Sequence, residues 1–245
     1  AFHSLESNRL FDDSTLQERF LSLWKAFAGR YKKYGDNVVF ELLNEIVEPN
    51  SDRWNMLSKK AVSTIRLVDP DRIIIIGGNL YNSVKTLKEL DYIDDERLVY
   101  TFHFYEPHLF THQGAYWEEP MKELNFKISY PIGPDDYKRY MCLSDKFRAS
   151  YPIRENMGKD YLKEELMPAL EFARERKAAL YCGEYGVIET ADMESRLRWH
   201  KDLCSLFMEY GIGKAVWCYK LMDFPLVDAE SKVINNDLIR IVSQK

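Results

Sequence analysis

The chain has 245 residues, of which 34 are Lys or Arg and 39 are Asp or Glu, for a formal net charge of −5. With 46% apolar and 14% aromatic residues and only 11 Gly and 9 Pro, its composition excludes an intrinsically disordered or collagen-like chain. Charges of both signs leave no basic surface for phosphate backbones, and the run at 73–76 is far shorter than the roughly 20 apolar residues of a bilayer span. We therefore expect neither a nucleic acid nor a membrane as partner.

The first predicted element is a helix. Apolar residues recur at helical spacing over 14–34, and Ser14 with Gln17 is typical of a capping box, so we predict one amphipathic helix there. The apolar run 38–43 predicts a buried strand that ends at Asn44 and Glu45.

The same alternation continues along the chain. We predict a helix over 51–68, a strand over 73–76, a short helix over 84–90 and a strand over 98–105. The alternation of helices and strands is interrupted over 106–158. This segment is rich in aromatic residues and proline, and we predict that it is an ordered insertion.

Five further elements complete the prediction. Helices are expected over 160–176, 192–210 and 236–242, and strands over 179–184 and 214–219. Strands that alternate with helices and are apolar on both faces belong to an α/β protein with a parallel sheet, either doubly wound or closed into an eight-stranded barrel. Polar residues at the strand ends favour the barrel, although only five strands are predicted.

Two carboxylates are the leading candidates for chemistry. Glu45 and Glu184 each end an apolar strand, where a buried carboxylate needs a partner or a role. Each could instead cap the helix that follows its strand. If both face one barrel mouth about 5 Å apart, they suit retaining glycoside hydrolysis, in which one carboxyl protonates the leaving oxygen and the other attacks the sugar.

Three polar residues could support these carboxylates. His103 and Tyr105 are two residues apart in a strand and so share one face. A Tyr hydroxyl would hold a nucleophilic Glu in place, although for either residue alone a structural role, as a hydrogen-bonded histidine or a half-buried tyrosine, is the commoner one. Asn44 offers a donor and an acceptor to a sugar hydroxyl.

Aromatic residues supply candidate sugar platforms. Trp217 ends the last predicted strand, where its indole could form a flat floor for a sugar ring or could pack in the core. Residues of the insertion could shape the rim of a cleft or form an aromatic core of their own; they are Tyr116, Trp117, His108 and His112.

Motifs for cofactors are lacking. Gly77 and Gly78 do not have the spacing of a dinucleotide fingerprint, and no phosphate loop, metal motif or nucleophile elbow is found, so we expect no cofactor and no metal. The four cysteines show no metal-ligand spacing and are interpreted as small buried apolar residues: Cys142, Cys182, Cys204 and Cys218.

Four segments together resemble glycoside hydrolase family 5, the cellulase family. They are Phe-Glu-Leu-Leu-Asn-Glu-Ile-Val-Glu-Pro at 40–49, Tyr-Thr-Phe-His-Phe-Tyr-Glu-Pro at 100–107, Leu-Tyr-Cys-Gly-Glu-Tyr-Gly-Val at 180–187 and Ala-Val-Trp-Cys-Tyr-Lys at 215–220. The resemblance is closest to the endoglucanase branch, in which a small subdomain follows the sixth strand.

That resemblance implies a (β/α)8 TIM barrel and a role for each candidate residue. Glu45 would be the general acid/base and Glu184 the nucleophile, and Asn44 would contact the 2-hydroxyl of the sugar. His103 and Tyr105 would lie around the nucleophile, and Trp217 would be the stacking floor. Residues 1–245 would form the catalytic domain, with an inserted subdomain at 106–158.

The chain also departs from the family pattern. Ile46, Val47 and Glu48 separate Glu45 from Pro49, where the family commonly has Asn-Glu-Pro. If 38–44 is the fourth strand, strands one to three are missing, and we expect another segment or another chain to complete the barrel. Residue 1 is Ala, so the chain is interpreted as the remainder of a longer one, and secretion and a cytoplasmic location both stay open.

We therefore predict a retaining endo-β-1,4-glucanase that hydrolyses cellulose or mixed-linkage β-glucan by double displacement. The alternatives are a mannanase or xylanase of the same family, or an inactive carbohydrate-binding fragment.

Overall fold

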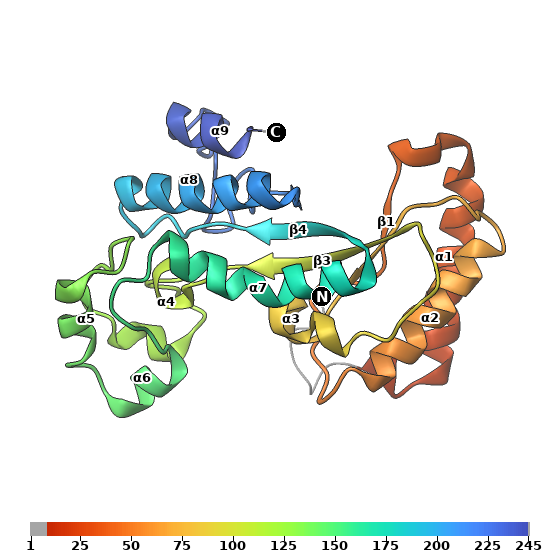
Figure 1. Ribbon diagram of the computed structural model, residues 1–245, viewed down its shortest axis with the longest axis horizontal. Helices are drawn as coiled ribbons and strands as arrows, with labels where there is room; N and C mark the ends of the chain where they lie inside the picture. Colours follow the sequence, from red (N-terminus) through yellow and green to blue (C-terminus); the bar gives the residue numbers. More distant parts are fainter. Residues whose placement is uncertain (1–8, 245) are drawn as a thin grey trace. The chain divides into compact units, whose positions relative to one another are not determined.

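Helices and strands alternate along residues 9–244, the part of the chain that the computed structural model describes (Figure 1). The strands are β1 (Phe40–Glu41), β2 (Ile74–Gly77), β3 (Leu98–Phe104), β4 (Ala179–Tyr185) and β5 (Gly213–Lys214), hydrogen-bonded in the order β1-β2-β3-β4-β5. Pairing is parallel between β1 and β2, with Phe40 opposite Ile74, and between β2 and β3, with Ile76 opposite Tyr100. The predicted α/β class is confirmed.

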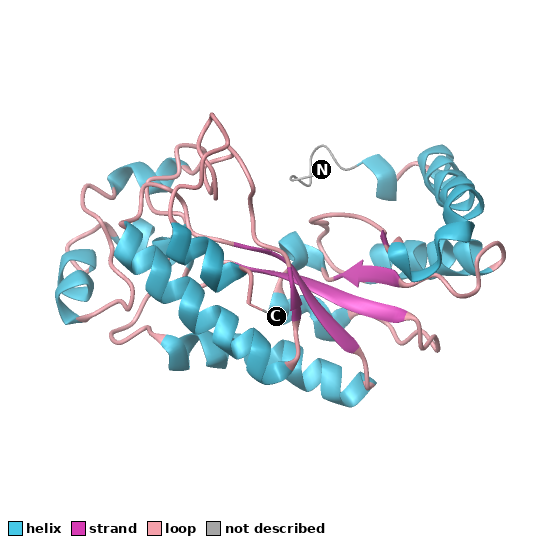
Figure 2. Cartoon of the chain, turned by 90° about the horizontal axis from the view of Figure 1, so that it is seen from above, coloured by secondary structure: helices cyan, strands magenta, loops and turns pink. Residues whose placement is uncertain are grey.

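The connections between the strands are mostly helical, and Figure 2 distinguishes them, in cyan, from the magenta strands. The α-helices are α1 (Ser14–Tyr31), α2 (Asp52–Arg66), α3 (Asn79–Asn82), α4 (His108–Thr111), α5 (Pro134–Tyr140), α6 (Asp145–Ser150), α7 (Lys159–Arg176), α8 (Met193–Tyr210) and α9 (Asn236–Val242). Short 3-10 helices lie at η1 (Arg9–Phe11), η2 (Lys32–Asn37), η3 (Val84–Glu89) and η4 (Glu119–Glu123). No helix within 9–244 has both the length and the apolar character needed to cross a membrane.

Contacts divide the chain into two compact units. The first comprises the described residues up to His103 together with 168–182, and the second comprises 104–167 and 183–244. The predicted insertion 106–158 lies wholly within the second unit, and its status as a separate subdomain stays a prediction.

The core of the first unit is built from the inward face of α2 and from β2. Trp54, Ile65 and Ile74 are fully buried, because the apolar residues of α2 recur at helical spacing and face the sheet. Helix α1 packs against α2 (Figure 1). The buried guanidinium of Arg72 ties the end of α1 to the neighbouring loop, since it donates to the carbonyl of Tyr31 at 2.8 Å.

The core of the second unit is aromatic. Phe110, Tyr130 and Phe147 from the insertion are fully buried, as are Trp199 and Phe207 of α8. Each large ring removes much apolar area from water, so this core stabilises a stretch that has little regular secondary structure. The insertion is ordered, as predicted, and it contains three of the short α-helices, α4 to α6.

Several element boundaries differ from the prediction. Helix α1 begins at Ser14, but its N-cap is Asp13, whose side chain accepts from the amides of Thr15 and Leu16, so the expected capping box is wrong. The short helix predicted over 84–90 is a 3-10 helix that ends at Glu89.

The two outer strands are shorter than predicted. β1 covers Phe40–Glu41 and β5 covers Gly213–Lys214, so Asn44, Glu45 and Trp217 lie in loops beyond the strand ends. An apolar run extends a strand only where a neighbouring strand continues the hydrogen-bond ladder. Three cysteines are buried as expected, but Cys142 is exposed.

Candidate active site

Glu45 lies in the loop after β1, in the first unit, and its carboxylate is held by His103. The Nδ1 atom of His103 is 2.8 Å from Oε1 of Glu45, and the Nε2 atom is 3.2 Å from the side-chain nitrogen of Asn82. An amide nitrogen only donates, so Nε2 accepts and the ring proton resides on Nδ1, which donates to Glu45. Asn82 therefore fixes the tautomer that places a proton between His103 and Glu45.

The loop that carries Glu45 has an unusual backbone. Glu45 has a φ of +48°, in the left-handed region, which costs about 1–3 kcal/mol for a residue with a side chain. The surrounding contacts offset this cost. Asn79 hydrogen-bonds the backbone nitrogen and carbonyl oxygen of Glu48, each at 2.9 Å, and the carbonyl of Ile46 accepts from the amide of Tyr81 at 3.1 Å.

Gly77, at the end of β2, makes room for this arrangement. A Cβ atom there would lie 2.5 Å from Oδ1 of Asn82, so only glycine lets the Asn82 side chain reach His103. Asn44, next to Glu45 in the chain, is exposed and lies in the same bend.

Glu184 lies near the end of β4, in the second unit, and its carboxylate is held by Tyr105. The Tyr105 hydroxyl donates to Oε2 of Glu184 at 3.0 Å. The Tyr105 ring is itself packed edge-on against His112 and Phe224, with centroid distances of 5.0 and 5.8 Å. The predicted contact between Tyr105 and the candidate nucleophile is therefore present, and His103 holds the other candidate carboxylate, Glu45.

Trp217 is half-buried in the same unit and is held through its backbone. Its amide donates to the carbonyl of Tyr185 at 2.9 Å. A Cβ atom on Gly186 would overlap the carbonyl oxygen of Trp217, so the close approach of these two chain segments requires glycine. Trp217 follows β5 rather than ending it.

A third cluster of polar residues, in the second unit, was not expected to carry chemistry. His108, His112 and Glu118 place one ligand atom each within 4.8 Å of one another. Burial disfavours ionisation of Glu118, but hydrogen bonds from His108 and Tyr151 outweigh it and lower the pKa of Glu118 to about 2. Burial and the neighbouring His108 lower the pKa of His112 to about 3, so its ring is neutral at ordinary pH.

The spacing of these residues was the overlooked signal. His108 and His112 are four residues apart around a helical turn, so their side chains point to one side. Glu48, another residue without an assigned role, is buried and forms an ion pair with Arg53.

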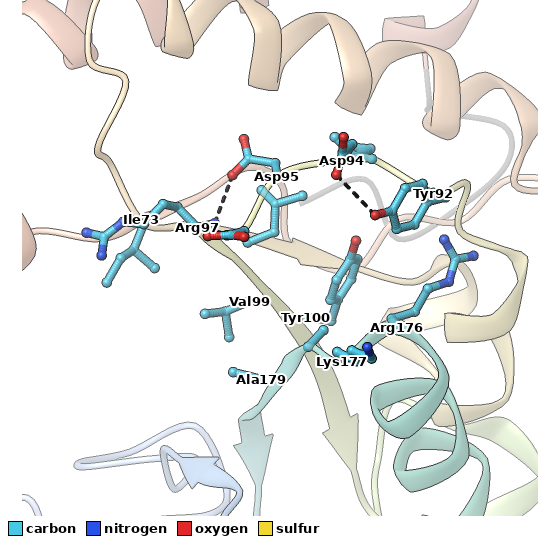
Figure 3. A pocket seen from close by; sticks show the side chains of 14 residues that line it. Ile73, Tyr92, Asp94, Asp95, Arg97, Val99, Tyr100, Arg176, Lys177 and Ala179 are labelled. Carbon is cyan, nitrogen blue, oxygen red and sulfur yellow. Dashed lines mark hydrogen bonds between the residues drawn. The ribbon is translucent and has the colours of Figure 1, made fainter.

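A cavity of about 590 Å³ lies in the first unit but contains none of the predicted site residues (Figure 3). It is bordered by the N-terminal ends of β3 and β4, with Asp95, Arg97 and Arg176 among its lining residues. Parallel α/β barrels place their chemistry at the opposite, C-terminal strand ends, where Glu45 and Glu184 lie. We therefore do not assign the hydrolytic site to this cavity.

Comparison with known proteins places the chain in a family. The family model described as Cellulase (glycosyl hydrolase family 5) matches residues 2–223. The chain belongs to this family. It is a glycoside hydrolase, and the resemblance seen in its sequence is confirmed.

Curated relatives match most or all of the chain. Endoglucanase C of Acetivibrio thermocellus is 42% identical over 245 residues, which are 100% of this chain and 71% of that protein. Cellodextrinase A of Ruminococcus flavefaciens is 35% identical over 83% of this chain and 54% of its own length.

Among solved structures, endoglucanase Cel5A of Thermotoga maritima superimposes with a TM-score of 0.78 at 30% identity, covering 96% of this chain and 69% of that one. The fold is thus a segment of a (β/α)8 barrel, as predicted.

Proposed function

We propose that this glycoside hydrolase is a retaining endo-β-1,4-glucanase that acts on cellulose or mixed-linkage β-glucan, with Glu45 and Glu184 as its catalytic pair. The observation that carries the proposal is that each carboxylate has its own donor, His103 for Glu45 and Tyr105 for Glu184. These donors are two residues apart, at the end of β3 and just after it. Endoglucanase C, 42% identical over the whole chain, supports the choice of substrate class.

The proposed mechanism is a double displacement at one sugar carbon, which requires the two carboxyl groups to stand about 5–5.5 Å apart in the working enzyme. Glu45 donates a proton to the departing glycosidic oxygen while Glu184 attacks the anomeric carbon and forms a glycosyl-enzyme. Glu45 then takes a proton from the water that releases the sugar. Retention follows because the carbon is inverted twice.

The neighbouring residues have distinct roles in this proposal. Tyr105 donates to the carboxylate of Glu184 and orients it for attack. His103, whose tautomer is set by Asn82, donates to Glu45 and holds it ready to exchange its proton with the substrate. Asn44 hydrogen-bonds the 2-hydroxyl of the sugar at the cleavage point, and Trp217 stacks on a sugar ring.

Two substitutions test the assignment of the pair. Glu184→Gln removes the nucleophile and is expected to abolish sugar release from barley glucan, whereas Glu45→Gln is expected to lower it by about 10²–10⁴-fold. Glu189→Gln is the matched control, because Glu189 is an exposed carboxylate five residues further along the same unit. Equal sugar release by the parent and Glu184→Gln would refute the proposal, as would an α-configured first product.

A second substrate class has support of its own. Crystal structures of the Thermotoga maritima enzyme have been determined with cellobiose and with mannotriose, so mannan is the leading alternative, followed by xylan. Product analysis on barley glucan, carboxymethylcellulose, mannan and xylan separates these substrates. A rapid fall in the viscosity of carboxymethylcellulose relative to new reducing ends identifies endo-acting cleavage.

We further propose that another segment or chain pairs with β1 to complete the barrel. Within 9–244, β1 is the terminal strand of the sheet order. Val39, next to β1, is 40% exposed, and Leu23 and Phe27 on α1 are 53% and 37% exposed. These side chains leave apolar surface at this edge that a pairing segment would cover. Light scattering tests this proposal, and a monodisperse, fully active monomer whose β1 amides exchange freely would contradict it.

A further inference from the structure

Three potential metal ligands gather in the second unit, and one of them, His112, packs against the ring of Tyr105. His108 belongs to α4, His112 directly follows it, and Glu118 lies six residues further on. Their ligand atoms are all within 4.8 Å of one another, and the two imidazole rings are stacked with centroids 4.0 Å apart. We propose that His108, His112 and Glu118 form a binding site for a divalent transition-metal cation of the Zn²⁺ class.

The hydrogen bonds of His112 leave a suitable nitrogen for a metal. The hydroxyl of Thr111 donates its single proton to the carbonyl oxygen of Tyr105. The same hydroxyl lies 3.0 Å from Nδ1 of His112, so there it must accept, and Nδ1 carries the ring proton. The lone pair of His112 is then on Nε2. Fixing the tautomer through the other ring nitrogen is the way proteins usually orient a metal-binding histidine.

His108 and Glu118 already face each other across the proposed site. Nε2 of His108 is 2.9 and 3.1 Å from the two carboxylate oxygens of Glu118. A bound cation would take the place of the proton between these groups, with that proton moving to Nδ1 of His108 or to solvent. The Tyr151 hydroxyl donates to Oε2 of Glu118 at 2.7 Å and so orients the carboxylate from behind.

Coordination requires the ligand atoms to approach one another and the two stacked imidazole rings, now at an interplanar angle of 14°, to tilt until their nitrogens converge on one ion. Bonds of about 2.0–2.2 Å in a tetrahedral site place the ligand atoms about 3.3–3.6 Å apart. The present separations, at most 4.8 Å, would contract by about 1.5 Å or less. The side chain of His108 is 40% exposed, which gives a cation an entry route and leaves a coordination position for water.

The chemistry of the ligands selects the class of cation. Two imidazoles and one carboxylate suit Zn²⁺, Co²⁺, Ni²⁺ and Cu²⁺, whereas Mg²⁺ and Ca²⁺ prefer oxygen ligands alone. Both rings have aromatic neighbours: His108 stacks on Tyr151 at 5.8 Å, and His112 packs against Phe224 at 5.2 Å. A metal here would tie the start of the insertion to the segment around Glu118.

Metal binding to the full chain, freed of metal with a chelator, tests the site directly. Equilibrium dialysis against Zn²⁺ is expected to give one ion per chain, and Co²⁺ is expected to give the visible absorption bands of a tetrahedral site. His108→Ala and Glu118→Gln each remove a ligand and are expected to weaken Zn²⁺ binding more than about tenfold. Thr111→Val, which frees the His112 tautomer, is expected to weaken it about tenfold.

Two control variants remove neighbouring groups that are not part of the site. Glu119→Gln removes the adjacent carboxylate, which is 81% exposed and pairs with Lys122, and Cys142→Ser removes the exposed thiol. Both are expected to bind Zn²⁺ like the parent.

Failure to bind Zn²⁺ at millimolar concentration would overturn the proposal, as would one ion per chain that persists in His108→Ala and Glu118→Gln. Circular dichroism verifies folding, and His108→Gln replaces any variant that unfolds. Because the readout is metal binding, the result does not depend on the proposed hydrolytic function.

Discussion

Removal of the Tyr105 hydroxyl tests how the proposed nucleophile is held. Tyr105→Phe deletes the 3.0 Å hydrogen bond to Glu184 and keeps the ring that packs against His112 and Phe224. A hydrogen bond to a charged group contributes about 1.5–3 kcal/mol. At about 1.4 kcal/mol per tenfold change in rate, we expect kcat to fall by about 10- to 150-fold.

The assay is steady-state hydrolysis of barley glucan, with kcat and KM determined separately. We expect the loss mainly in kcat, because the hydroxyl orients a reacting group rather than the distant parts of the substrate. Tyr92→Phe is the matched control, since the Tyr92 hydroxyl also donates to a carboxylate, Asp94 at 3.2 Å, but borders the cavity at the N-terminal strand ends. A folded Tyr105→Phe enzyme within about threefold of the parent kcat would refute the reasoning.

Three further predictions concern positioning, acid stability and the core. Asn82→Ala removes the buried donor to His103 and is expected to lower kcat. It is also expected to lower the free energy of unfolding by about 1–3 kcal/mol. A destabilised variant with an unchanged kcat would contradict a positioning role for Asn82. Because the pKa of Glu118 is lowered from 4.5 to about 2, its ionised form stabilises the folded state above pH 4.5 and this contribution is lost as the pH falls through about 2. The melting temperatures of the parent and of Glu118→Gln, measured from pH 6 to 2, should therefore converge as the pH falls. A difference in melting temperature that stays constant over this range would contradict the lowered pKa of Glu118. Ile65 is fully buried, so Ile65→Ala should lower the free energy of unfolding, measured in urea, by about 2–5 kcal/mol. Met56 on the same helix is 58% exposed, so Met56→Ala should lower it by less than about 0.5 kcal/mol. Similar losses in the two variants would contradict the assignment of the buried face of α2.

Some elements were predicted well because their signals are local. Helix α8 ends at Tyr210 because Gly211 takes the left-handed conformation, with a φ of +65°, that closes many helices. Helix α9 begins at Asn236 because the side chain of Asn235 accepts from the amides of Asp237 and Leu238. In both cases the residues that decide the boundary lie within one turn of it, so they are visible in the sequence.

Other features depended on distant parts of the chain. The outer strands β1 and β5 are only two residues long, since strand length follows from the neighbouring strand and not from the apolar run alone. Two features that involve residues close in the chain were also missed: Asp13 caps α1 in place of the expected Ser14, and His108 pairs with Glu118 ten residues further along.

The amino-acid sequence by itself determined the family, the alternation of helices and strands, and the candidate residues Glu45 and Glu184. Only the tertiary structure decided what holds them: the donor to Glu45 lies 58 residues away in the chain and the donor to Glu184 lies 79 residues away. Capping and periodicity arise from hydrogen bonds and packing within a few residues, whereas these two contacts exist only once the strands have been brought together by burial of their apolar side chains.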